Sequence, residues 1–228
     1  MIILSFDISS NTIGWSVLEK NINGIIKSIT YSYIKPNKKG NIFSRLHDTQ
    51  KQIIDILNKY NPDVVAIEEI ISYMPGASTA NTIIMLTTFN RMIGLTVYNT
   101  IGKLPFMLSV MAIRHGLKIG KEFPSKEDIP KLLEYHIQKF KHNILVDKHG
   151  KPDMVNYDMA DAIAVGLFAF KKLDQVQQEI FKYKKIIETD KKTTPTDKKR
   201  LKKAKQEYKE LTTQYKEITG SDEYSGSI

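Results

Sequence analysis

Acidic residues in three separate parts of the chain have the types and positions that a metal-dependent phosphodiesterase needs. Asp7 and Glu68 each directly follow a short apolar run that is typical of a buried strand. Asp158 and Asp161 are three residues apart in a stretch of helical character, so they share one helix face. Two divalent cations about 4 Å apart require several carboxylates that converge on them. The sequence therefore predicts hydrolysis of phosphodiester bonds with two metal ions.

Each acid taken alone also has a plainer interpretation. Asp7 could cap a turn, Glu68 could open a polar loop, and Asp158 could complement the dipole at a helix N-terminus. Asp161 is harder to explain in this way, because it lies deeper in the helix among apolar residues, where an unpaired carboxylate is costly. The order of two strand ends followed by an Asp-x-x-Asp helix is more specific than any single acid.

The elements that must position these acids follow from the apolar periodicity. We expect a β-hairpin over residues 1–19, strands at 24–34, 64–67 and 104–110, and helices at 42–59, at 77–99 capped by Ser78, through Arg114, at 125–140 capped by Ser125, and from Asn156 to about Phe168. Strands followed by an alternation of strands and helices predict an α/β sheet covered on both faces. The helix at 77–99 is apolar all round, so it is either internal or shared with a second subunit.

The amino-acid composition changes beyond Lys171. This segment is rich in Lys, Glu and Gln and carries 15 Lys and Arg against 10 Asp and Glu, with a break at 193–196. We expect a nuclease-like domain at 1–170, a basic αα-hairpin at 171–218 and a disordered tail at 219–228.

Composition limits the class of protein further. The chain has 228 residues, 41% of them apolar and 26% charged, which is typical of a soluble globular protein. It has no Cys, so any metal must be held by carboxylates, His or water, which favours Mg²⁺ or Mn²⁺. No apolar run approaches about 20 residues, and Asp7 interrupts any signal-peptide core. We expect a cytoplasmic protein of bacterial, phage or viral origin. The net charge of +9 suggests nucleic acid or an acidic membrane surface as partner.

The acidic motifs resemble those of a known nuclease family. Asp7-Ile-Ser-Ser followed by Gly14-Trp, Ala66-Ile-Glu68 and Asp158-Met-Ala-Asp161 resemble the motifs of RuvC, the Holliday-junction resolvase of the RNase H-like superfamily. The resemblance covers residues 1–170 and implies a five-stranded mixed sheet flanked by helices. It also implies a homodimer joined through the 77–99 helix, two Mg²⁺ ions that Mn²⁺ can replace, and paired nicks across a four-way junction in recombination and repair. By this match the metal ligands are Asp7, Glu68 rather than Glu69, Asp158 and Asp161.

Two features depart from the family pattern or extend it. Ile8-Ser9 replaces the Gly-containing turn that usually follows the first Asp, which should make this turn less permissive. Tyr73 is the aromatic residue nearest the position of the family's junction-opening wedge, although ordinary loop packing explains it equally well. Candidate phosphate contacts, each of which could also be a solvated surface charge, are Arg114, Lys118, Lys121, Lys126 and Lys131.

Other classes remain open at this point. Asp7-Ile-Ser-Ser also resembles the first phosphate loop of actin-like ATPases and sugar kinases, but the second such loop is not found in the sequence. A catalytically inactive junction-binding protein is a further alternative, against which the intact acids argue. Related RNase H-like substrates and the RuvC-type domain of RNA-guided nucleases are possible as well, but the guide-binding lobes are missing.

Overall fold

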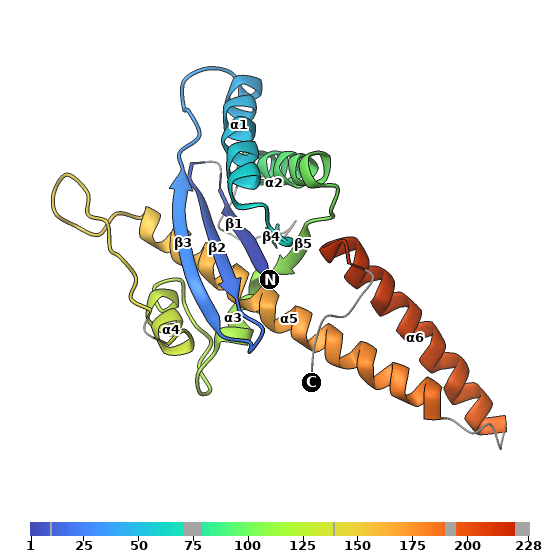
Figure 1. Cartoon of the computed structure of the whole chain (residues 1–228). Helices are drawn as coiled ribbons and strands as arrows, with labels where there is room; N and C mark the ends of the chain where they lie inside the picture. Colours follow the sequence, from blue (N-terminus) through green and yellow to red (C-terminus); the bar gives the residue numbers. More distant parts are fainter. Residues whose placement is uncertain (10, 71–78, 139, 190–194, 222–228) are drawn as a thin grey trace. The chain divides into compact units, whose positions relative to one another are not determined.

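The fold is built on one mixed β-sheet. The computed structural model describes residues 1–9, 11–70, 79–138, 140–189 and 195–221, with the side chains of 195–197 left aside. Its strands are β1 (Ile2–Ile8), β2 (Ile13–Lys20), β3 (Ile26–Ile34), β4 (Val64–Glu69) and β5 (Phe106–Ser109). Its helices are α1 (Ile42–Tyr60), α2 (Ala80–Ile101), α3 (Val110–Leu117), α4 (Ile129–His136), α5 (Val155–Thr189) and α6 (Pro195–Thr219). The strand order is β3-β2-β1-β4-β5, which confirms the predicted five-stranded α/β sheet (Figure 1).

Two central strands, β1 and β4, end on the same side of the sheet because they run parallel. β1, β2 and β3 form an antiparallel meander, whereas β4 runs parallel to β1 and β5 runs parallel to β4. The carboxyl ends of β1 and β4 therefore lie side by side in the middle of the sheet. This edge carries Asp7 and Glu68.

The turn after β1 is closed by Ser9, not by glycine. The Ser9 hydroxyl donates to the carbonyl of Thr12 at 2.6 Å and accepts the backbone N–H groups of Asn11 and Thr12. Among the described non-glycine residues only Asn61 has a positive φ, so Ser9 adopts an ordinary backbone conformation. Ser9 therefore carries no backbone strain, although the resemblance implied a glycine in this turn.

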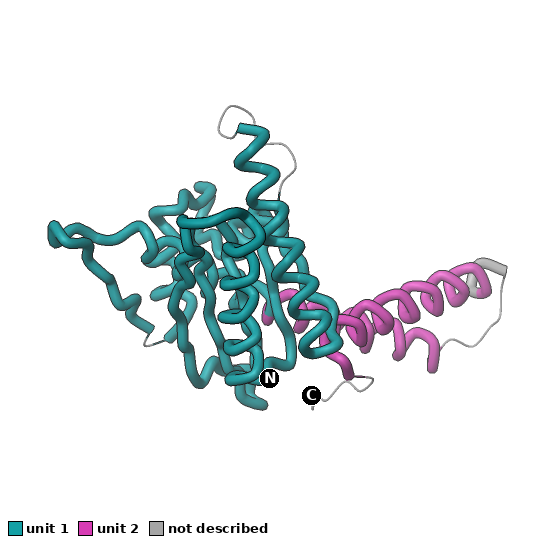
Figure 2. Tube along the Cα trace, turned by 90° about the horizontal axis from the view of Figure 1, so that it is seen from above, with its two compact units in different colours: residues 1–169 teal, residues 170–228 magenta. Residues whose placement is uncertain are grey.

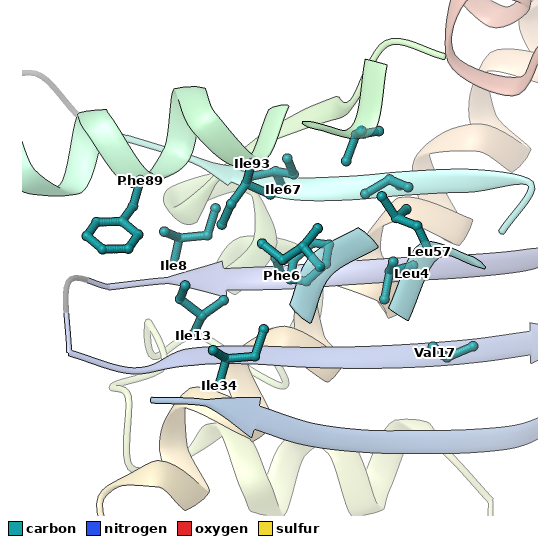
Figure 3. Packing of buried hydrophobic residues seen from close by; sticks show 13 residues of the cluster. Leu4, Phe6, Ile8, Ile13, Val17, Ile34, Leu57, Ile67, Phe89 and Ile93 are labelled. Atoms are coloured by element: carbon teal, nitrogen blue, oxygen red, sulfur yellow. The ribbon is translucent and has the colours of Figure 1, made fainter. Parts of the chain in front are cut away.

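Strand alternation divides the side chains between two layers. Leu4, Phe6 and Ile8 of β1 belong to the hydrophobic cluster formed with α1 and α2, and Phe89 and Ile93 of α2 pack there (Figure 3). Successive side chains of a strand point to opposite faces. Ile3, Ser5 and Asp7 therefore point to the other face, where the Ser5 hydroxyl donates to the carbonyl of Ala162 in α5 at 2.8 Å.

Two predicted helix starts were wrong. α2 begins at Ala80 with Thr79 as its N-cap, one residue after Ser78, which lies outside the described residues. The helix predicted at 125–140 is only Ile129–His136, and Ser125 does not cap it. The carboxylate of Asp128 instead accepts both the N–H and the hydroxyl of Ser125, which closes a separate turn before the helix. These hydrogen bonds also lower the pKa of Asp128.

The apolar helix α2 is not wholly internal. Phe89, Ile93 and Val97 are buried against the sheet, but Ile84 is 61% exposed and Leu95 is 59% exposed. The first alternative, a wholly internal helix, is therefore wrong, and a surface shared with a second subunit stays a prediction. No helix in the described ranges is long and apolar enough to cross a membrane.

The chain divides into two compact units, Met1–Ala169 and Phe170–Ile228 (Figure 2). α5 continues without a break across this division, whereas the sequence suggested one helix that ended near Phe168 and another after Lys171. In the second unit, Leu201, Ala204 and Tyr215 of α6 are buried, and the Gln177 amide of α5 donates to the Tyr215 hydroxyl. Thr219 ends α6, and residues 222–228 of the predicted disordered tail lie outside the described residues.

Candidate active site

Three elements bring the four predicted acids to one edge of the sheet. Asp7 lies near the end of β1 and Glu68 near the end of the parallel neighbour β4. Asp158 lies in the first turn of α5, and Asp161 follows one turn later. Asp7 is paired with Gly14, which lies against the backbone of Asp158, and β4 brings Glu68 alongside β1. The four carboxylates therefore lie in one neighbourhood, where Glu68, Asp161 and Asp158 all act electrostatically on Asp7.

The alternation of β4 separates Glu68 from Glu69. Val65 and Ile67 face the cluster under α1 and α2, so Ala66 and Glu68 face α5 together with Asp7. Glu69 points the other way and is exposed. The amide of Asn90, which is 2% exposed in α2, donates to the Glu68 carbonyl at 2.9 Å and holds this strand end. Sequence reasoning missed Asn90, although a polar residue inside an apolar helix was a visible signal.

Small residues let α5 lie against the sheet. The hydroxyls of Ser5 and Ser16 are 2.7 Å apart, and both reach the carbonyl of Ala162, next to Asp161. A Cβ on Gly14 would lie 2.0 Å from the Asp158 carbonyl oxygen, well inside van der Waals contact. Gly14 therefore sets how closely the helix that carries two of the acids approaches the hairpin that follows Asp7.

Lys126 supplies a positive charge among the acids. Its Nζ lies 2.9 Å from Oδ1 of Asp158 and 3.2 Å from Oδ2 of Asp161. Lys126 belongs to the turn that Ser125 and Asp128 close, which holds its backbone before α4 begins. Burial lowers the pKa of Lys126, but Asp161, Asp7 and Asp158 outweigh that effect and raise it. Sequence reasoning proposed Lys126 as a phosphate contact and did not foresee these ion pairs.

Three of the acids, Asp7, Glu68 and Asp161, are poorly stabilised as anions where they stand. Burial, followed by the charges of Glu68 and Asp161, raises the pKa of Asp7 well above its usual value. Burial, followed by Asp161, raises the pKa of Glu68 to about 7, even though Arg114 and Lys126 act in the opposite direction. Burial also raises the pKa of Asp161, against the opposing effect of Lys126. Additional positive charge at this edge would favour the ionised forms.

The chemistry of these donors fits a hard divalent cation, because every donor is a carboxylate oxygen. Their present positions do not form a finished site, however. Within the described residues, no three acidic or His side chains stand close enough to hold a metal ion. The Lys126 ammonium group lies between Asp158 and Asp161. Metal binding therefore requires the acid side chains to converge and Lys126 to give up its place between the two aspartates.

The raised pKa of Glu68 predicts how stability depends on pH without divalent cations. Between its ordinary value of 4.5 and about 7, the folded protein binds this proton more tightly than the unfolded chain does. The free energy of unfolding should therefore fall as pH rises through this window, and Mg²⁺ should raise the Tm more at about pH 8 than at about pH 5. Thermal melts in EDTA and in Mg²⁺ test this expectation.

The matched controls for these melts are the two neighbouring glutamates of β4. Glu68→Gln should flatten the fall of Tm between pH 5 and 8, and Glu69→Gln should leave it unchanged, because Glu69 is exposed and points away from the acids. An equal fall of Tm with pH in wild type and Glu68→Gln would contradict the assignment of Glu68 as the titrating group.

The structure brings only some of the predicted DNA-contacting residues to the acids. Arg114 of α3 lies close enough to lower the pKa of Glu68, and Lys126 pairs with two acids. Among the described residues, Lys118, Lys121 and Lys131 form no ion pair with the four acids, and Lys121 and Lys131 are exposed. Tyr73 lies outside the described residues.

Sequence comparison identifies relatives over the first unit. The profile of the family "Crossover junction endodeoxyribonuclease RuvC" matches residues 3–168. A protein named crossover junction endodeoxyribonuclease RuvC from Ehrlichia ruminantium, strain Welgevonden, is 31% identical over 172 residues. That match covers 73% of this chain and 94% of the relative. The homologous protein of strain Gardel is 30% identical with the same coverage.

Solved structures show the same fold over this region. Thermus thermophilus RuvC in complex with a Holliday junction substrate matches with a TM-score of 0.56 at 14% identity, over 75% of this chain and 94% of that chain. The yeast mitochondrial Holliday junction resolvase Ydc2 matches with a TM-score of 0.51 at 19% identity, over 72% of this chain and 75% of that chain. The five-stranded mixed sheet with its flanking helices is therefore an RNase H-like fold.

Proposed function

The chain belongs to the RuvC family of crossover junction endodeoxyribonucleases, and from that premise we propose that Asp7, Glu68, Asp158 and Asp161 form its catalytic metal site. The enzyme is an endonuclease that resolves four-way DNA junctions by hydrolysis of phosphodiester bonds, in recombination and repair. The observation that supports the site most directly is the placement of four carboxylates from β1, β4 and α5 in one neighbourhood, at the end of the sheet where β1 and β4 finish.

Each part of this site has a distinct task in the reaction. Asp7 and Glu68 stand on the two central parallel strands, which give a rigid base, and Asp158 and Asp161 stand on the helix packed over them. When bound, two Mg²⁺ or Mn²⁺ ions would activate a water molecule and stabilise the leaving oxygen. Arg114 and Lys126 are cationic side chains close to the acids, so they are placed to offset charge on the scissile phosphate.

A panel of substrates tests this function. With Mg²⁺, a four-way junction should be nicked faster than a flap, a duplex or an RNA–DNA hybrid of the same sequence. Preferential nicking of the hybrid would move the assignment to RNase H activity. Hydrolysis of ATP without any nicking would instead support the ATPase alternative, which the family match over residues 3–168 does not favour.

The exposed face of α2 is proposed as the interface of a homodimer. Leu95 is 59% exposed and Tyr98 is 51% exposed, and both line a hollow of about 450 Å³ with Leu104 and Met107. Exposed apolar side chains that cluster in this way are typical of protein interaction sites. Symmetric nicking of a junction with two-fold symmetry requires two active sites, which a second copy of the chain would supply.

Leu95→Arg should convert the dimer into a monomer, because it buries a charge without a partner at the centre of the interface. Light scattering coupled to size-exclusion chromatography measures the mass of both proteins. Ile22→Arg is the matched control, since Ile22 is 97% exposed in the turn between β2 and β3 and should leave the mass unchanged. A wild-type chain that is monomeric at concentrations where it cleaves junctions would contradict the dimer.

A further inference from the structure

The second unit carries a basic surface that the family relationship does not explain. The RuvC profile ends at residue 168, so α6 lies outside the region shared with the relatives. Six of the eight residues 198–205 are Lys or Arg, and none is acidic. The remainder of α6, residues 206–219, has two Lys and three Glu. The positive charge is therefore concentrated in the first half of one helix.

These cationic side chains face solvent and form no ion pair with any side chain that the structure describes. All six are exposed, whereas Leu201 and Ala204 between them are buried within the protein; the six are Lys198, Lys199, Arg200, Lys202, Lys203 and Lys205. Within the described residues, none of the six lies within ion-pair distance of a carboxylate. We call this set the α6 basic patch.

The charge pattern works against the stability of the helix that carries it. Like charges four residues apart, such as Lys198 and Lys202, repel each other on a helix surface. Cations near a helix N-terminus also oppose the helix dipole, and α6 begins at Pro195. A helix under selection for folding alone would spread acidic residues among these cations, as the second half of α6 does. The patch is therefore best explained by an anionic partner.

We propose that the α6 basic patch binds the phosphate backbone of duplex DNA, independently of the metal site. The eight residues extend over about 12 Å of helix. Duplex DNA presents one phosphate charge per about 1.7 Å, or about seven over that length, which is close to the number of cations. Lys198, Lys202 and Lys205 form one stripe along the helix and line a shallow hollow with Leu201. Lys and Arg contacts to phosphate carry no base information, so this binding should be independent of sequence.

A membrane surface is a weaker match for the same charge. A helix that lies on a bilayer needs an exposed apolar face opposite its cationic face. The apolar residues of this part of α6, Leu201 and Ala204, are buried inside the protein and leave no such face. The choice of DNA as the polyanion rests on the proposed function, because a junction resolvase acts on duplex arms.

The experiment compares two triple variants of the full chain that lose the same charge from the same unit. Lys198, Lys202 and Lys205 are changed to Gln in one, and the exposed Lys182, Lys184 and Lys185 of α5 are changed to Gln in the other. Binding to a plain duplex is measured in EDTA over a series of salt concentrations. Each phosphate contact contributes about 0.9 to the slope of log K against log salt, so the patch variant should lose about 2 to 3 from this slope and bind roughly tenfold more weakly.

The control triple should keep nearly the wild-type slope, and a patch variant with Arg at the three positions should bind like wild type. Equal losses in both Gln triples would mean that net charge acts without a specific surface, and would overturn the proposal. Binding of the wild type to phosphatidylcholine–phosphatidylserine vesicles that depends on the patch, with duplex binding unaffected, would overturn it as well. Circular dichroism verifies that each variant keeps the total helix content of the wild type.

The same measurements separate this proposal from the proposed function. If the slope of log K against log salt depends on the α6 basic patch but the protein cleaves no junction, the patch proposal is supported and the proposed function is refuted. Junction cleavage by a protein whose duplex binding ignores the patch would refute the patch alone.

Discussion

Replacing Asp7 with Asn is expected to slow junction cleavage by about a thousandfold or more, while junction binding persists. Metal ions contribute several kcal/mol of transition-state charge stabilisation, and each 1.36 kcal/mol is about a factor of ten in rate. Asn keeps the shape of the side chain but removes the charge that would hold a cation. Single-turnover cleavage of a four-way junction in Mg²⁺ and binding to the same junction in EDTA measure the two effects.

The same substitution should raise the stability of the metal-free protein. Asp7 is buried, and Glu68 and Asp161 add repulsion to the cost of that burial. A neutral amide avoids both effects, so the Tm in EDTA should rise, by about 2–4 °C for each kcal/mol relieved. Mg²⁺ should then stabilise Asp7→Asn less than it stabilises wild type.

Asp55→Asn is the control, because Asp55 is exposed on α1 and should change neither cleavage nor the response to Mg²⁺. A variant at Asp7 that lost activity and stability together would indicate a structural role in place of the proposed one. Cleavage at the wild-type rate would remove Asp7 from the catalytic site.

Gly14→Ala is expected to reduce cleavage by about a hundredfold without removing any group that touches DNA or metal. The new Cβ would lie 2.0 Å from the Asp158 carbonyl oxygen and 3.0 Å from the Met159 nitrogen. These are backbone atoms of α5, so neither can rotate away and the helix start must shift by about 1 Å. A misplacement of that size can cost about a hundredfold in rate. Overpacking should also destabilise the protein by about 1–3 kcal/mol.

Gly102→Ala is the control that separates loss of cleavage from loss of stability. Gly102 ends α2 with a φ of +69° and has no atom within 4 Å of an added Cβ, so Ala there should cost about 1 kcal/mol in backbone strain. Both variants should lose stability in chemical denaturation, but only Gly14→Ala should lose cleavage well below its melting temperature. Equal cleavage rates in Gly14→Ala and Gly102→Ala would contradict the prediction. They would mean that the hairpin moves to accommodate the new Cβ and that α5 keeps its position.

The parts of the site that follow from local pattern were predictable. The short apolar runs before Asp7 and Glu68 place these acids at strand ends, and the spacing of Asp158 and Asp161 places them on one helix face. The parts that depend on tertiary contacts were not predictable in the same way. The ion pairs of Lys126 join residues 32 and 35 positions apart, and they depend on a turn that was expected to be helical.

The predicted helix boundaries were wrong for a related reason. Ser125 and Asp128 both have side chains that can cap a helix or close a turn, and propensity does not distinguish the two uses. The continuity of α5 was missed because its composition changes at Lys171 while its backbone does not. The positions of Asn90 and Gly14 have meaning only beside the elements that they contact.

The contact between α5 and the sheet limits the size of the side chains that can be substituted there. Ser5, Ser16, Gly14 and Gly166 line that contact, and a Cβ on Gly166 would lie 2.7 Å from the Ser5 hydroxyl. A larger side chain at any of them should change the spacing of the proposed catalytic carboxylates, although none of the four residues carries a charge. Descendants of this sequence must therefore preserve small volume at Gly14 and Gly166, and both small volume and the hydroxyl at Ser5 and Ser16. Two substitutions with compensating sizes should be better accepted than either alone.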